Sequence, residues 1–186
     1  TAVATNGLAS GQVTYLLNRN QSSDVWRQNI DIGEKDSEPT LDTNHHIVFY
    51  NGNTYTNYCS VHSWKNGICV ECNSIEEPQL VDDYYEIGNY GNLVWFQQYV
   101  DAGNININAK LTANIVANEN LLDSSGNVQG TPKYNWTPIG RGYSNSSDSY
   151  NGVFDGACYS ISGLYSNGTE NYCGFFGKMN KGTIKN

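Results

Sequence analysis

The sequence predicts a mainly β protein with two short helices, in which a small α+β module is followed by the opening coils of a β-solenoid. Hydrophobic residues make up 38% of the 186 residues, so the chain can form a packed core. Only 15% of the residues are charged, and polarity comes instead from Asn, Ser, Thr, Gly and Tyr, as on the β-rich surfaces of secreted proteins. Beyond residue 103, short alternating apolar runs are separated by Gly, Asn and Ser turns without a tight hairpin, which favours stacked coils over a meander.

The first module is expected to cover residues 1–78 and to contain a helix within residues 5–18. The apolar side chains that share one face of this helix are Ala9, Val13, Leu16 and Leu17. Ser10 is a candidate cap and Asn18 a candidate stop. The segment therefore predicts an amphipathic helix at the start of the module.

A β-hairpin is expected later in the same module. Residues 47–50 form an apolar strand that leads into Asn51-Gly52, a pair that suits a tight turn because both central positions need φ > 0. Tyr55 and Tyr58 would lie on the return strand. A compact cysteine-containing segment completes the module.

The second part, residues 79–186, is expected to open with a strand and a helix. The strand covers residues 84–87, and Asn89 can cap the helix that follows. The apolar face of this helix consists of Leu93, Phe96 and Val100. Gly103 stands where a left-handed residue ends many helices. We expect the aromatic side chains of the helix to cover the apolar interior and the unpaired strand edges at the end of the solenoid.

Three later segments alternate in the way expected of solenoid strands. Their apolar positions are Leu111, Ala113 and Ile115, then Tyr159 and Ile161, and finally Ile184. An unfinished solenoid is difficult to stabilise alone, because neighbouring coils bury most of its core. We therefore expect the chain to be a fragment whose solenoid continues beyond Asn186, or to self-associate through the open solenoid end.

Five ordered motifs in residues 83–186 carry a resemblance to a known family. They are "YYEIGNYGNLVWFQQYV" with "NAKLTANI", then "WTPIG", "GVFDGACYSISGLYSN", "CGFFG" and "GTIKN". Together they resemble the GLUG-type repeat regions of bacterial cell-surface adhesins, which also occur beside IgA1-specific peptidases. The resemblance implies a right-handed β-helix whose open end is closed by the preceding helix. The upstream module is similar to one found between or after such repeats, where a tail like "NGICVEC" often follows.

The segment from Cys59 to Cys72 has the spacing of a metal-binding knuckle. Its candidate ligands are Cys59, His62, Cys69 and Cys72, arranged as two half-knuckles around a turn-like stretch. Three cysteines and one histidine match tetrahedral zinc, with Zn–S distances of about 2.3 Å and Zn–N distances of about 2.0–2.1 Å. Since the protein would fill all four positions, the sequence predicts one structural zinc ion.

Other interpretations of the cysteines stay open at this stage. In a secreted chain, Cys59 could instead form a disulfide with Cys69 or Cys72, and the CxxC spacing is also that of a redox-active dithiol. His62 favours zinc, because a disulfide has no need of a histidine. Cys158 and Cys173 could pair on successive coils or could be buried thiols. The polar turn at residues 123–127 lacks the closing Glu of a calcium loop, so calcium is not expected.

Net charge and motif content argue against several function classes. The formal net charge is −8, whereas a nucleic-acid-binding protein needs a basic stripe, and an anionic membrane surface would repel such a chain. No apolar run approaches the roughly 18 residues that a membrane-spanning helix needs. We therefore expect neither nucleic-acid binding nor membrane insertion.

The sequence offers little support for catalysis. The acids considered for acid–base chemistry are Glu76, Glu77, Asp82, Asp83 and Asp155. Neighbouring acids on a strand point to opposite faces, so they do not form a facing pair. His45 and His46 precede a strand and are expected to be ordinary surface residues. These observations predict a protein that is not an enzyme.

Two functions remain, both on the bacterial cell surface or outside the cell. In the first, the chain is a non-catalytic module for adhesion or interaction with a host glycan or protein, or a structural spacer. In the second, it is an accessory part of a surface enzyme, either a polysaccharide-degrading β-helix enzyme or an IgA-protease-like peptidase. A similar fold alone is weak evidence for enzymatic activity, because one fold can host many unrelated functions.

Overall fold

The computed structural model describes residues 5–19, 21–59, 62–140, 149–167 and 173–186. The chain divides into two compact units, one formed by residues 1–63 with 70–72 and the other by residues 64–69 with 73–186.

The first unit contains two short helices where the sequence predicts one. Helix α1 covers Thr5–Ala9 and helix α2 covers Gln12–Asn18. Gly11 interrupts them with φ of 82°, a left-handed conformation that glycine adopts without a steric penalty. A Cβ at this position would also press against the side chains of Ile30 and Val48. The predicted single helix is therefore wrong, because the chain must turn sharply beside these two residues.

The buried side of helix α2 consists of polar side chains and not of the predicted apolar face. Leu16 is 50% exposed and Leu17 is 38% exposed, whereas Thr14 and Asn18 are buried. The Thr14 hydroxyl donates a hydrogen bond of 2.6 Å to the side chain of Gln28. The Asn18 side-chain oxygen accepts hydrogen bonds from two backbone amides of the following loop. The helix is thus held by hydrogen bonds to the loop and not by an apolar stripe.

The first unit has very little apolar core. Val48 is the one buried apolar side chain among the described residues that belong to this unit. Asn57 is buried as well, and its side chain binds the backbone of Ile30 and Asp31 as acceptor and that of Gln28 and Ile47 as donor. Because buried apolar area is the main source of folding free energy, a unit of this kind needs another source of stability.

The predicted hairpin of the first unit forms, but its loop is wider than a two-residue turn. Strand β1 (Phe49–Tyr50) pairs antiparallel with strand β2 (Tyr55–Thr56). The Asn51 side chain accepts hydrogen bonds from the backbone amides of Asn53 and Thr54. Gly52 is the position with positive φ, at 90°. The Asn51 side chain therefore shapes a four-residue loop in place of the tight turn.

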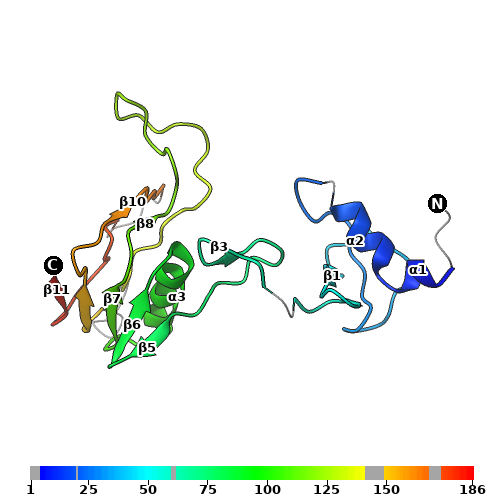
Figure 1. The fold of residues 1–186 in the computed structure, drawn as a ribbon, viewed down its shortest axis with the longest axis horizontal. Coiled ribbons are helices and arrows are strands. Elements are labelled where there is room, and N and C mark those ends of the chain that lie inside the picture. The colour runs from blue at the N-terminus through cyan, green and yellow to red at the C-terminus, as the bar shows by residue number, and fades with distance from the viewer. Residues whose placement is uncertain (1–4, 20, 60–61, 141–148, 168–172) are drawn as a thin grey trace. The chain divides into compact units, whose positions relative to one another are not determined.

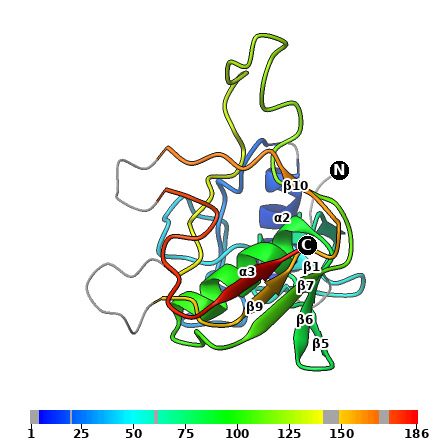
Figure 2. The same cartoon turned by 90° about the vertical axis from the view of Figure 1, so that its left-hand side faces the viewer.

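The second unit is built around a five-stranded sheet and one helix. Its elements are β3 (Trp64–Lys65), β4 (Ile68–Cys69), β5 (Gln79–Val81), β6 (Tyr84–Ile87), α3 (Tyr90–Asp101), β7 (Asn108–Leu111), β8 (Ile115–Val116), β9 (Val153–Asp155), β10 (Ile161–Ser162) and β11 (Thr183–Lys185). The sheet has the order β11-β9-β7-β6-β5, and helix α3 lies beside it (Figures 1 and 2). Its neighbouring strands are parallel except for the antiparallel pair β5 and β6.

The mainly β character with few short helices is confirmed, but the predicted right-handed β-solenoid is wrong. The described residues form one mixed five-stranded sheet and three separate two-stranded sheets, and they show no closed coil. The strands are only two to four residues long. Alternating apolar residues show that one face of a strand is buried, but they do not specify its partner strand, so the same pattern suits both architectures. The expected self-association through an open solenoid end loses its basis with this correction.

Helix α3 follows the sequence prediction closely. The Asn89 side chain caps it by accepting a hydrogen bond of 2.9 Å from the Asn92 amide. Leu93, Phe96 and Val100 are buried, as their spacing predicts. Phe96 makes edge-on ring contacts with Tyr150 and with Phe154 of strand β9, so it joins the helix to the sheet. The helix therefore contributes the centre of the core of the second unit.

Replacing Phe96 with alanine should destabilise the second unit by about 3–5 kcal/mol, the usual cost of removing a buried aromatic side chain. Gln98→Ala is the matched control, because Gln98 lies on the exposed face of the same helix. Denaturant unfolding of the full chain, followed by tryptophan fluorescence, measures both variants. Equal free energies of unfolding for the two variants would contradict this description of the core.

Candidate metal centre

The segment between residues 59 and 72 brings four metal-binding side chains together. The candidate ligand atoms of Cys59, His62, Cys69 and Cys72 all lie within 4.8 Å of one another. His62 Nδ1 is 3.6 Å from Cys59 Sγ and 3.4 Å from Cys72 Sγ. A zinc ion bound tetrahedrally to sulfur and nitrogen would hold these atoms about 3.6 Å apart. The cluster that the sequence predicts is therefore present, with a geometry compatible with zinc.

A tight hairpin places Cys69. Strands β3 and β4 pair antiparallel, with Trp64 opposite Cys69. They are joined by Asn66 and Gly67, whose φ values of 52° and 73° are those required by a two-residue turn with left-handed central residues. Cys69 is fully buried at the end of this hairpin. The turn chemistry of the sequence thus fixes the position of one ligand.

Backbone hydrogen bonds hold the return of the chain from Cys69 toward Cys72. The Asn73 amide donates to the Cys69 carbonyl at 2.9 Å, and the Cys69 amide donates to the Ser74 carbonyl at 2.8 Å. Asn73 adopts a left-handed conformation with φ of 59°, which asparagine tolerates better than most residues. Cys69 and Cys72 therefore lie on a closed turn, the local structure that a CxxC half-knuckle needs.

The donor set fits a zinc ion better than any other common metal. Three sulfur donors and one imidazole suit zinc, whereas calcium and magnesium require oxygen ligands. Three thiolates this close together would repel one another strongly without a cation, so binding a metal ion favours the ionised ligands. No disulfide bond joins the cysteines of the described residues. Cys158 and Cys173 are both exposed and lie outside the cluster.

Four of the five acids considered for catalysis have local structural roles. Asp82 and Asp83 form the turn between β5 and β6, each with positive φ. Glu76 accepts a hydrogen bond of 2.8 Å from the side chain of Asn89. Asp155 accepts hydrogen bonds from the Asn186 side chain and the Ala157 amide and pairs with Lys185 at 3.0 Å. These interactions, with that of Asn186 the largest, lower the pKa of Asp155 to about 2.

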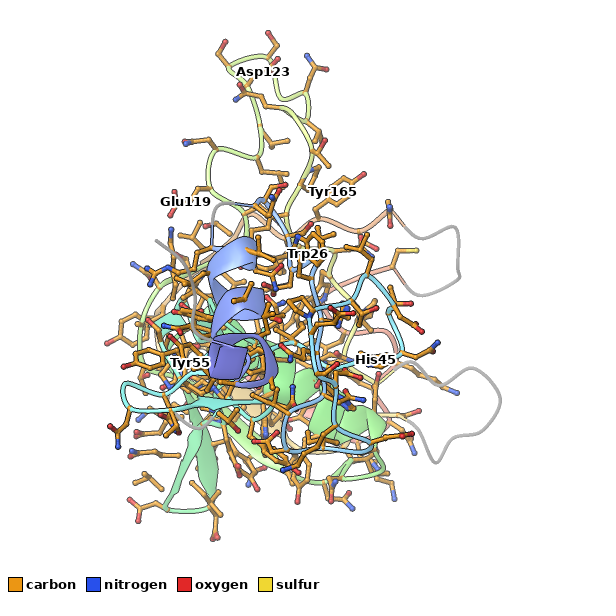
Figure 3. The ribbon with its side chains drawn as sticks, turned by 90° about the vertical axis from the view of Figure 1, so that its right-hand side faces the viewer. Trp26, His45, Tyr55, Glu119, Asp123 and Tyr165 are labelled. Carbon is orange, nitrogen blue, oxygen red and sulfur yellow. The ribbon has the colours of Figure 1, made fainter. Side chains whose placement is uncertain are left out.

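The two remaining histidines and the polar loop also bind local partners. His45 Nδ1 lies 2.6 Å from an Asp36 carboxylate oxygen, and His46 Nδ1 lies 2.8 Å from the Asn29 side-chain oxygen. Asp123 lies at the tip of an extended loop (Figure 3). Its carboxylate accepts hydrogen bonds from the amides of Ser125 and Asn127, and these bonds lower its pKa. No sequence pattern predicts the Asp36–His45 pair, because the two residues are nine positions apart in an irregular segment.

No protein-family model, curated protein or solved structure matches the chain. Among the described residues, none of the helices has the length and apolar character needed to cross a membrane. The metal centre is therefore interpreted from its own geometry.

The metal cluster predicts a specific pattern of thiol reactivity. With zinc bound, Cys59, Cys69 and Cys72 should resist a thiol reagent, while the exposed Cys158 and Cys173 react quickly. A chelator should release one zinc ion per chain and add the three protected cysteines to the reactive ones. Zinc content and thiol titration on the same sample measure this. Cysteines that stay protected under denaturant and chelator would indicate disulfides and contradict the metal centre.

Proposed function

We propose that the chain is a non-catalytic interaction module of a secreted bacterial surface protein, stabilised by one structural zinc ion. The observation that carries this proposal is the cluster of Cys59, His62, Cys69 and Cys72, with all ligand atoms within 4.8 Å. Four protein ligands complete a tetrahedral coordination sphere and leave no position for water or substrate. Complete coordination by protein is typical of structural zinc sites, whereas catalytic sites keep one position open.

The composition of the first unit supports a stabilising role for the metal. Its described residues bury a single apolar side chain, Val48, together with the polar side chains of Thr14, Asn18, Gln28 and Asn57. Hydrogen bonds between such groups contribute only about 0.5–1.5 kcal/mol each, because water competes for the same partners. A structural zinc ion can supply on the order of 10 kcal/mol. Zinc would therefore be the main source of stability near residues 59–72.

The assignment to a surface protein rests on composition and on the resemblance to GLUG-type repeat regions. The chain carries few charges and many Tyr, Asn, Ser and Thr residues, which suit an exposed surface that contacts glycans or proteins. Bound zinc would also keep Cys59, Cys69 and Cys72 from oxidation outside the cell, since metal-bound thiolates do not pair as disulfides. A module beside a surface peptidase is the second setting in which such regions occur.

Loss of a zinc ligand should lower the thermal stability of the chain strongly. We expect Cys72→Ser to remove zinc binding and to lower the melting temperature about as much as adding a chelator to the unsubstituted chain. Cys158→Ser is the matched control, because Cys158 is exposed and lies outside the cluster. His62→Ala should act like Cys72→Ser, and His46→Ala like the control. Thermal unfolding with and without chelator measures all four variants.

Two outcomes would contradict the proposal. One is a chain that unfolds at the same temperature with and without chelator, which would remove the structural role of the metal. The other is a zinc-loaded chain that hydrolyses polysaccharide or peptide substrates, which would show that the module is catalytic.

A further inference from the structure

A polar cavity lies in the second unit, and none of the four residues of the metal cluster lines it. It encloses about 300 Å³ between the β3–β4 turn and the segment that leads from β8 to Tyr134. Lys65, Asn66, Glu119, Thr131, Lys133 and Tyr134 are among the residues that line it. Glu119 lies near the base of the loop that carries Asp123 at its tip (Figure 3). The volume is at the lower end of the range for small-molecule sites, so the cavity suits a ligand of about one sugar ring.

The side chains of Asn66 and Asn118 hold the walls of this cavity in place through hydrogen bonds to the backbone. The Asn66 side chain accepts a hydrogen bond from the Tyr90 amide at 3.1 Å and donates one to the Val116 carbonyl at 2.8 Å. The Asn118 side chain accepts a hydrogen bond from the Tyr134 amide and donates one to the Tyr134 carbonyl, both at 2.9 Å. The segments on both sides are therefore held in place without a ligand, which reduces the entropic cost of binding.

The aromatic wall of the cavity is also fixed. The ring of Tyr134 packs against the ring of Tyr90, with centroids 4.9 Å apart. Burial, and to a lesser extent the neighbouring Tyr134, raises the pKa of Tyr90 to about 12, so its hydroxyl stays neutral. The Lys133 ammonium lies 4.8 Å from the centroid of the Tyr134 ring. The lining of the cavity thus contains an aromatic ring and a cation that lies over this ring.

The net charge of the residues that line the cavity is positive, whereas the net charge of the whole chain is negative. Lys65 and Lys133 contribute two positive charges and Glu119 one negative charge, whereas the whole chain has a net charge of −8. Ion pairs between described residues involve His45 with Asp36 and Asp42, and Lys185 with Asp155. Neither lysine of the cavity takes part in them. Both ammonium groups therefore keep their positive charges for an anionic group of a ligand, with that of Lys133 lying over the Tyr134 ring.

The combination of groups selects a class of ligand. A carboxylate on the ligand would pair with the lysines, while hydroxyl groups would donate to Glu119 and exchange hydrogen bonds with Thr131. A bare sulfate would pair with the lysines but has no hydroxyl group that could donate to Glu119. A neutral sugar would leave both lysines without a counter-charge. A sugar that carries a carboxylate offers a partner to both lysines, to Glu119 and to Thr131.

We propose that this cavity binds a carboxylated sugar residue, such as a uronic or sialic acid at the end or within a glycan chain. The inference rests on the proposed function as an interaction module and names its ligand class and contact site. Lys133 and Lys65 bind the carboxylate, Glu119 and Thr131 bind hydroxyl groups, and Tyr134 borders the site.

Titration of the zinc-loaded full chain with glucuronate, glucose, acetate and sulfate tests the inference. Isothermal calorimetry or chemical shifts of Tyr134 report binding. We expect glucuronate to bind and each of the other three probes to bind at least tenfold more weakly. Lys133→Gln and Lys65→Gln should each weaken glucuronate binding at least fivefold. Lys110→Gln, which removes the same charge from an exposed strand position outside the cavity, should change it less than twofold.

Several results would overturn the inference. They are no glucuronate binding at millimolar concentration, equal binding of glucose, equal binding of sulfate or acetate, or an equal loss in Lys110→Gln. Zinc content measured on the same sample separates this inference from the proposed function. A chain with one zinc ion that ignores glucuronate overturns only the sugar site, and a metal-free chain that binds glucuronate overturns only the zinc assignment.

Discussion

The close approach of three thiol groups and one imidazole is the constraint on which the account of this protein depends. Cys59, His62, Cys69 and Cys72 lie within a segment of 14 residues, and their ligand atoms come within 4.8 Å of one another. A bound cation would convert these thiols to thiolate ligands, and the metal–ligand bonds would add folding free energy that protonated thiols do not supply. The first unit buries little apolar surface, so it would gain the most stability from a bound metal ion. A metal ion is therefore the most economical explanation of how this part of the chain folds.

The β3–β4 hairpin links several features of the second unit. Its turn places Cys69, while the Asn66 carbonyl and side chain bind the backbone of Gly91 and Tyr90 at the start of helix α3. Any Cβ at Gly91 would collide with the backbone of Gly67, so the hairpin and the helix approach as closely as two backbones can. Asn66 also lines the polar cavity. One short turn thus supports the metal ligand, the helix and the cavity together.

The sequence predicted the features that depend on short-range spacing and missed those that depend on long-range pairing. The cluster of Cys59, His62, Cys69 and Cys72 and helix α3, with its Asn89 cap, are encoded within short stretches of the chain, and the structure contains both. The β-solenoid was wrong because alternation along one strand does not specify which strand lies next to it. The cavity was missed because Lys65 and Asn66 are about 50–70 residues before the rest of its lining residues. The break at Gly11 follows from contacts with Ile30 and Val48, which spacing within the helix does not reveal.

X-ray absorption at the zinc edge tests the central claim most directly, because it reports the atoms bound to the metal in solution. The account predicts three sulfur neighbours at about 2.3 Å and one nitrogen at about 2.0–2.1 Å. The His62→Ala chain, which should lose zinc binding, should give no such spectrum. A spectrum with only oxygen and nitrogen neighbours, or a purified chain that takes up no zinc, would contradict the account.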